Sequence, residues 1–318
     1  MMGHNHAISG AAAWVAVAAS TNHFPGLGLV QIEPWQVLTG AVVCAGAALL
    51  PDADHHNATI AHSVPVIGGA VAGAAGKLSG GHRHGMHSLL AIAVTWFATV
   101  WIGRLLVPVA PPAWVNLAVV LSLCTFLAAA IGWATRKLGL VRRGAAAIFI
   151  SLLIAGSVVA AVTLTPLGSR VSDLSPETVE IPVAAVAVIV ALICFASKAL
   201  KIVKTWLKAW LIGIALGAAL ALFLPTEIGW FPLCVTVGYA VHILGDFLTV
   251  EGINWFWPLK LKAPNAIANA PLLGQVWHSN GYMALPVLGH AGSMREHLFG
   301  IVLGLYAVIG IGTSVLPG

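Results

Sequence analysis

The sequence predicts an all-α fold: a polytopic integral membrane bundle of about nine transmembrane helices. Hydrophobic residues make up 59% of the 318 residues, charged residues make up only 8%, and the mean hydropathy is +0.95. A soluble domain carries about 25% charged residues, so this chain has too few to cover a surface that faces water. We therefore expect a single membrane-embedded domain over residues 1–318.

The expected spans follow the apolar runs, because a helix that crosses a bilayer needs about 20 mainly apolar residues. These runs lie near 7–24, 35–50, 88–110, 113–135, 145–166, 181–200, 207–224, 230–250 and 298–316. A Gly/Ala-rich stretch near 64–76 is too short to cross comfortably. We interpret it as re-entrant or packed against other helices.

Other local features favour a membrane protein over alternative classes. The N-terminus has no basic region and no clear cleavage site, so we do not expect a cleavable signal peptide. The four cysteines stand singly in apolar runs, which predicts small core residues rather than disulfides or a zinc ribbon. The net charge of +5 lies in short loops and indicates orientation in a membrane, not nucleic-acid binding.

Charged loops orient the spans. The basic segments 136–143 and 198–208 should face the cytoplasm, and the acidic loop 170–180 should face outside. Counting spans from these loops places every polar cluster described below on the cytoplasmic side. The sequence thus predicts a multi-pass protein of a bacterial-type inner membrane, with its polar site near the cytoplasmic face.

The first polar cluster follows the run at 35–50. Pro51 ends the helix, and Asp52, Asp54, His55 and His56 follow at once. Carboxylate oxygens and imidazole nitrogens are common ligands of zinc and manganese. A solvated helix end is the alternative, but two Asp and two His in five residues favour a metal site.

The second cluster precedes the run at 88–110 and contains His82, Arg83, His84 and His87 among glycines. Glycine lets the backbone approach a ligand closely, and the start of a helix favours anions. Arg83 could hold a phosphate or carboxylate through two hydrogen bonds. The alternative is an interfacial loop whose His and Arg side chains meet lipid headgroups.

The third cluster is His242 and Asp246, which are four residues apart and so share one helix face. Ionisable groups inside a membrane are functional candidates by default, although such a pair can also simply tie helices together. Two weaker candidates are His6, which opens the first span, and Glu296, which precedes the last one. Glu296 could be a ligand or a partner of Arg295.

Together these motifs resemble the YdjM-like family of membrane-bound, metal-dependent hydrolases, which includes a LexA-regulated member. The matching residues occur in the family's order: His6 to Gly10, Leu49 to His55, Gly81 to Arg83, His87 to Leu90, His242, Asp246, Leu248, Thr249, Gly252, Trp257 and Pro258. Met86 stands where the family typically has Thr. Residues 111–229 carry no matching motif, so we treat them as a helical insertion within the domain.

The resemblance implies a hydrolase with one or more divalent metal ions, zinc first and manganese or magnesium as alternatives. The proposed metal ligands or their immediate supports are His6, Asp52, Asp54, His55, His82, His87, His242, Asp246 and Glu296. An early His, an Asp pair and a helical His and Asp four residues apart are also similar to zinc-dependent phospholipase C and related nucleases. That similarity would imply two or three ions and a phosphodiester substrate.

The expected reaction is attack by a metal-activated water on a phosphoester or other ester of a membrane lipid or lipid-linked substrate. Asp54 would accept a proton, and Arg83 would stabilise the negative charge that develops on the oxygen. A metal or proton-coupled transporter is the alternative function, because intramembrane His and Asp also mark ion pathways. A catalytically silent scaffold is a third. The sequence leaves the oligomeric state open.

Overall fold

The protein is described from a computed structural model. The structure describes residues 1–19, 26–30, 32–55, 57–63, 67–105, 107–109, 179–181, 183–223 and 229–315. Helices dominate this part of the chain, which confirms the all-α prediction, and the described strands are a single short antiparallel pair.

Three helices form the centre of the bundle: α1 (Gly3–Ala18), α2 (Pro34–Ala47) and α10 (Phe231–Phe247). Glycines allow their backbones to approach closely. A Cβ atom added to Gly10 of α1 would lie 2.6 Å from the Cys44 carbonyl oxygen of α2, and one added to Gly238 of α10 would lie 2.5 Å from the same oxygen. Small residues of this kind permit tight packing between membrane helices.

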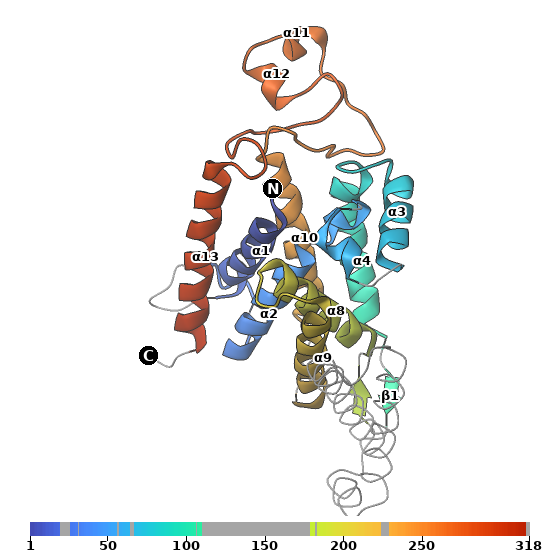
Figure 1. Ribbon diagram of the computed structural model, residues 1–318, viewed down its shortest axis with the longest axis vertical. Coiled ribbons are helices and arrows are strands. Elements are labelled where there is room, and N and C mark those ends of the chain that lie inside the picture. Colours follow the sequence, from blue (N-terminus) through green and yellow to red (C-terminus); the bar gives the residue numbers. More distant parts are fainter. Residues whose placement is uncertain are drawn as a thin grey trace, which may run out of the picture.

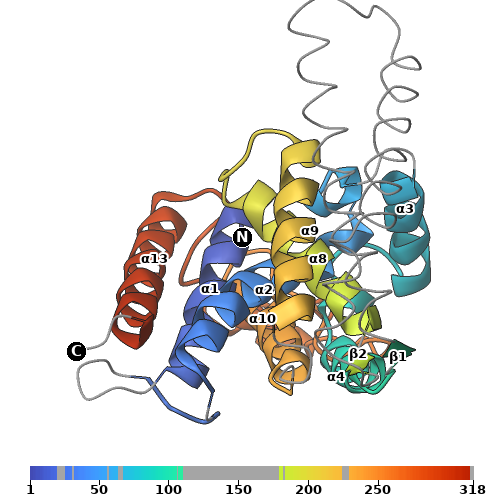
Figure 2. The ribbon, with the colours of Figure 1, turned by 90° about the horizontal axis from the view of Figure 1, so that it is seen from below.

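The remaining long helices pack around this centre. Helix α13 (Met294–Val315) covers α1 on one side, and α4 (Leu89–Gly103) covers α10 on the other (Figures 1 and 2). Helix α8 (Val183–Ala199) packs on α2, and α9 (Trp206–Phe223) packs on α8. Buried side chains such as Trp14, Phe231 and Ile189 fill the space between them.

Short elements gather at the end of the bundle where α2 and α10 finish. They are the 3-10 turns η1 (Pro51–Asp54), η2 (Thr59–His62) and η3 (Gly85–His87) and helix α3 (Ile67–Ser79), which packs on η1 and η2. The segment 248–293, with the single-turn helices α11 (Asn265–Ala268) and α12 (Leu273–Val276), extends beyond this end (Figure 1).

Within the described residues, two helical stretches are long and apolar enough to cross a membrane: Pro34–Asp54 and Met294–Val315, with hydropathies of 1.4 and 2.1. Four other apolar helices are shorter: Leu89–Gly103, Ala184–Ala199, Trp206–Gly217 and Phe231–Phe247. Each falls short of the roughly 20 residues of a full span. The count of nine spans therefore stays a prediction.

The apolar runs located most described helices within a few residues, but one predicted span is wrong at its end. A helix was expected over 88–110, whereas α4 stops at Gly103 and residues Val107–Val109 form β1, which pairs with β2 (Val179–Ile181). Pro108 lacks a backbone N–H and disfavours helix in the residue before it. The predicted spans 113–135 and 145–166 and the loops 136–143 and 170–178 lie outside the described residues.

Candidate metal centre

His and Asp side chains from four distant parts of the chain converge at the end of the bundle where α2 and α10 finish. They form three adjoining groups, within each of which the possible ligand atoms lie within 4.8 Å of one another. The inner group is His6, His242 and Asp246; the central group is Asp52, His87 and His242; the outer group is Asp54, His82 and His87. His242 and His87 each belong to two groups.

The central group has separations that suit a metal ion. The Nε2 atoms of His87 and His242 are 3.1 Å apart, and Asp52 Oδ1 lies 3.8 and 3.6 Å from them. Asp246 Oδ2 lies 3.5 and 3.7 Å from the same two nitrogens. Ligand atoms about 2.1 Å from a tetrahedral ion lie roughly 3.4 Å from each other, so an ion could sit among these atoms after small shifts.

The packing of α10 on α2 fixes the orientation of His242. Its Nδ1 lies 2.7 Å from the Ala48 carbonyl oxygen, and because a carbonyl can only accept a hydrogen bond, Nδ1 carries the hydrogen. The Nε2 atom of the neutral ring is then left with its lone pair directed at His87 and Asp52. Metal-binding histidines are commonly held in this way by a backbone carbonyl. Gly238 lies one turn before His242 and makes this close approach possible.

The inner group is the most deeply buried. The His6 ring stacks on the His242 ring, with centroids 3.6 Å apart and planes at 14°, and His6 Nε2 lies 3.3 Å from Asp246 Oδ1. The same oxygen lies 2.5 Å from the Met1 ammonium nitrogen and 3.4 Å from Arg83 Nη2. Asp246 therefore turns one oxygen to these cations and His6, and the other to the central group.

The outer group lies closest to the surface. His82 Nδ1 is 2.9 Å from Asp54 Oδ1, and His87 Nδ1 is 3.7 Å from Asp54 Oδ2. The His82 side chain is 33% exposed and that of Asp52 is 22% exposed, whereas the side chains of His87 and His242 are fully buried. Access from outside the protein is therefore at the Asp52 and His82 side of the cluster.

Unpaired buried atoms concentrate at this site. Among the described residues, five buried side-chain polar atoms have no hydrogen-bond partner: His6 Nδ1 and Nε2, Asp54 Oδ2, His87 Nδ1 and Trp230 Nε1. Four of them belong to the cluster. Buried polar atoms nearly always have partners, and an ion or water is a frequent reason for an exception. The donor set of imidazoles and carboxylates fits a divalent ion such as zinc.

Arg83 lies beside the cluster, held by the loop that follows α10. It has a positive φ of 63°, and its Nη1 donates hydrogen bonds to Thr249 Oγ1 (3.2 Å) and the Gly252 carbonyl oxygen (3.3 Å). Glu251 Oε2 lies 3.8 Å from Nη1. The side chain of Arg83 is 15% exposed, so the guanidinium faces both Asp246 and the opening of the site.

The structure adds Glu251, which the sequence analysis missed. Burial raises the pKa of this carboxyl, but hydrogen bonds from its backbone, His290 and Thr249 and the charge of Arg83 outweigh burial and hold the pKa below its ordinary value. The one sequence signal for Glu251 is its position two residues after Thr249, which belongs to the family motif.

Two predicted ligands lie outside the three groups. Glu296 accepts hydrogen bonds at Oε1 from Met2 N and Asn5 Nδ2, both at 2.6 Å, and at Oε2 from Gly292 N at 2.7 Å. In the structure Glu296 thus holds the start of α1, and its role as a metal ligand stays a prediction. His55 stacks obliquely on His82, with centroids 4.6 Å apart, and its Nδ1 faces Asn57 N at 3.3 Å. It supports His82 without joining a ligand group.

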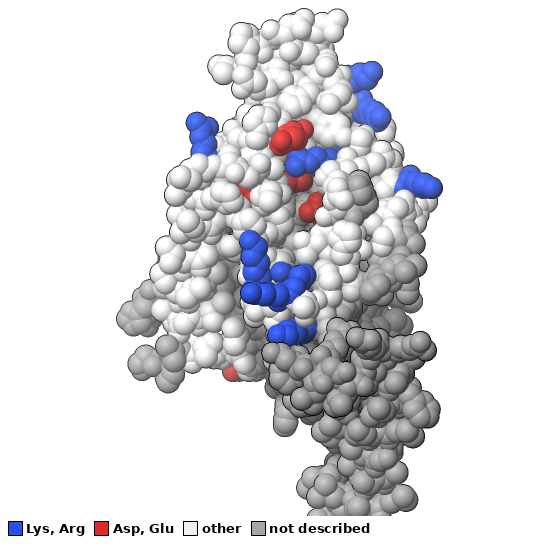
Figure 3. All heavy atoms as spheres, in the orientation of Figure 1, with Lys and Arg blue, Asp and Glu red and all other residues white. Residues whose placement is uncertain are grey.

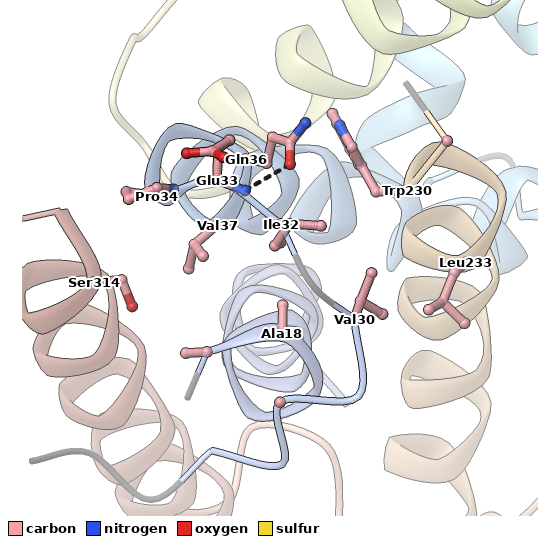
Figure 4. A pocket seen from close by; sticks show the side chains of 13 residues that line it. Ala18, Val30, Ile32, Glu33, Pro34, Gln36, Val37, Trp230, Leu233 and Ser314 are labelled. Atoms are coloured by element: carbon pink, nitrogen blue, oxygen red, sulfur yellow. Dashed lines mark hydrogen bonds between the residues drawn. The ribbon is translucent and has the colours of Figure 1, made fainter. Parts of the chain in front are cut away.

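A roomy cavity lies elsewhere. It has a volume of about 1010 Å³ and lies at the opposite end of α1 and α10, between Ala18, Glu33, Trp230 and Ser314 (Figure 4). None of the predicted site residues lines it, and its Glu33 takes part in the capping of α2 with Gln36. On the face of the protein shown in Figure 3, acidic and basic side chains lie next to one another in the upper half.

A scan against protein families matches residues 1–198 to the YdjM inner membrane protein family. No curated protein and no solved structure matches the chain. The matched range contains His6, the Asp52 to His55 cluster and the His82 to His87 cluster, whereas His242 and Asp246 lie beyond it. The match covers more than half of the sequence, and the chain therefore belongs to the YdjM inner membrane protein family.

Proposed function

We propose that this inner membrane protein is a metal-dependent hydrolase that cleaves a phosphoester or other ester of a lipid or lipid-linked substrate. The observation that carries this proposal is the convergence of four histidines and three aspartates into adjoining groups with unpaired buried nitrogen and oxygen atoms. Purely structural His–Asp pairs would satisfy one another's hydrogen bonds. Here, two nitrogens of His6 in the inner group, and His87 Nδ1 and Asp54 Oδ2 in the outer group, lack such partners.

The sharing of ligands limits how many ions the cluster holds. Because Nδ1 of His242 is bonded to Ala48, only its Nε2 is available, and that atom can bind an ion in the inner or the central group, but not in both. The inner and outer groups share no residue. Because the central group shares one histidine with each of the others, the cluster accommodates either one ion in the central group or two ions, one in the inner and one in the outer group.

We favour the central group as the primary site. The inner group already has the Met1 ammonium and Arg83 next to Asp246 Oδ1, so a further cation there would be repelled. At the central group, the Nε2 atoms of His87 and His242 each lie within 3.8 Å of Asp52 Oδ1. Asp246 Oδ2, from the neighbouring inner group, lies equally close to both nitrogens. When bound, a divalent cation supplies Lewis acidity and an acidic water at neutral pH.

The residues of the chain divide the remaining tasks. Asp54 Oδ2 is buried and without a hydrogen-bond partner, so it is available to accept a proton from an attacking water. His82 Nδ1 donates a hydrogen bond to Asp54 Oδ1 (2.9 Å) and so orients the carboxylate. Arg83 presents a fixed positive charge to an anionic substrate oxygen at the opening of the site. A site near the membrane surface suits an amphiphilic substrate.

The proposed membrane arrangement is that of the sequence analysis: about nine spans, with the site at the cytoplasmic face. It is supported by the common location of the polar residues. His6 lies near the start of α1, Asp52 and Asp54 follow α2, His87 precedes α4, and His242 and Asp246 lie near the end of α10. Accessibility labelling of cysteines introduced near His82, in intact and permeabilised cells, tests the assigned side.

The test of function combines metal analysis with turnover. The protein is purified in detergent, its metals are measured, and phosphoesters and lipid extracts are screened. We expect metal-dependent hydrolysis that is lost in Asp52→Ala and His242→Ala but kept in His297→Ala, whose histidine is exposed. Metal or proton movement into proteoliposomes without any hydrolysis would instead establish the transporter. Absence of both would leave a scaffold and overturn the proposal.

A further inference from the structure

An apolar groove runs along the outside of the bundle between α1, α10 and α13. Its volume is about 330 Å³, which is within the usual range for small-molecule sites of about 300–1,000 Å³. Its walls are mainly aliphatic and aromatic side chains, including Ala12 and Ala16 of α1, Leu244 of α10, and Phe299 and Leu303 of α13. The hydroxyl of Ser9, which also lines it, donates its hydrogen to the His6 carbonyl oxygen.

One end of the groove is formed by the residues that contact the metal-binding cluster. Met1 and Gly245 both line it. Gly245 directly precedes Asp246, and a Cβ atom added to Gly245 would lie 3.4 Å from the His6 ring. The Met1 nitrogen is 2.5 Å from Asp246 Oδ1. This end of the groove is thus separated from the inner group only by Met1 and Gly245.

Helix α13, which forms one wall of the groove, also carries exposed apolar side chains. Ile301, Val302, Leu305 and Val308 of α13 are all more than half exposed, and a helix that is apolar on its exposed face belongs in lipid. A lipid chain can therefore reach the groove sideways from the bilayer, without crossing water.

We propose that this groove binds the acyl chain of the lipid substrate and so places the ester phosphate at the metal-binding cluster; this inference rests on the proposed function. The walls offer a chain only apolar contact, which selects for hydrocarbon. The cluster at the end of the groove offers cationic and metal-binding groups, which select for an anionic head. Together they specify an acylated phosphoester rather than a soluble one.

The experiment uses the full-length, zinc-loaded protein in nanodiscs that contain a phosphatidic acid with a diazirine in its acyl chain. After illumination, the labelled peptides are identified by mass spectrometry. Two matched variants are compared, Leu303→Trp, which fills the groove, and Leu305→Trp, which adds the same bulk to an exposed site on the same helix. Zinc content and chromatographic profile are measured to verify that both variants fold.

We expect labels on the lining segments of α1 and α13, a several-fold loss of these labels in Leu303→Trp, and wild-type labelling in Leu305→Trp. A soluble phosphate monoester such as glycerol 3-phosphate should lower the labelling by competing at the cluster. Labelling that is equal in both variants, or unaffected by the competitor, would show an annular lipid and overturn the proposal. Labelling requires no turnover, so the two proposals can fail separately. If the competitor and Leu303→Trp both reduce labelling but no hydrolysis is found, lipid binding in the groove is supported and the hydrolase function is overturned.

Discussion

The inner and outer halves of the cluster differ in what holds them. The inner half, His6, His87, His242 and Asp246, is almost fully buried, and its helical members sit where α1, α2 and α10 pack closely. The outer half, Asp52, His82, Arg83 and Glu251, lies on turns and loops and is partly exposed. Under the proposed function, we expect the inner half together with Asp52 to hold the ion, and the other residues of the outer half to contact the substrate.

The largest effect is expected from a ligand of the inner half. His242→Ala removes the nitrogen shared by two groups, so zinc affinity should fall by more than about 100-fold, and turnover should disappear with it. Equilibrium dialysis with zinc measures the affinity, and His297→Ala, at an exposed histidine, is the control. Unchanged zinc binding in His242→Ala would remove His242 from the ligand set.

The next effect concerns helix packing rather than a ligand. In Gly238→Val, the added side chain would meet the Cys44 carbonyl oxygen, move α10 away from α2 and break the bond from His242 Nδ1 to Ala48. Loss of such a supporting contact lowers metal affinity by about 10–100-fold. Gly312→Ala is the control, because nothing lies within 4 Å of a Cβ atom there. Equal zinc affinities in the two variants would show that packing does not orient His242.

A substitution in the outer half should separate turnover from metal binding. Arg83→Gln removes the positive charge at the opening, so kcat should fall by about 10²–10³-fold while zinc content at saturation stays unchanged. Steady-state kinetics and metal analysis on the same preparation measure both quantities, with the exposed Arg295→Gln as control. If zinc is lost together with activity, Arg83 belongs to the metal-holding half.

The smallest effect concerns the pH dependence of Glu251. Its pKa is held below the ordinary value in the folded protein, so its ionised form stabilises the fold above its unfolded pKa. This contribution is lost as the pH falls through the folded pKa. Thermal unfolding should therefore show Glu251→Gln melting slightly below wild type at pH 7, with the gap closing in acid. A gap that widens as the pH falls would contradict the assigned sign.

The sequence was sufficient for most of the described helices and for the residues that the structure brings together in the three groups, because both have strong local signals. Long apolar runs locate α10 and α13, and polar residues inside or beside such runs are rare enough to stand out. The spacing of His242 and Asp246 correctly predicted one shared face, since Nε2 and Oδ2 are 3.7 Å apart.

The remainder depends on contacts between distant segments. The acceptor for His242 is the Ala48 carbonyl, and every residue has a carbonyl, so no side-chain pattern reveals it. Glu296 has the charge of a ligand, yet its partners are Asn5 and the backbone amides of Met2 and Gly292. The division of the ligands into three groups likewise follows from side-chain directions that spacing along the chain does not determine.

X-ray absorption at the zinc edge tests most directly whether the converging residues hold an ion. For the purified, zinc-loaded protein we predict nitrogen and oxygen neighbours at about 2.0–2.1 Å, with imidazole scattering that weakens in His242→Ala because only His87 remains in the central group. Sulfur neighbours at about 2.3 Å, contributed by cysteines such as Cys44 or Cys234, or the absence of stoichiometric zinc, would contradict the account.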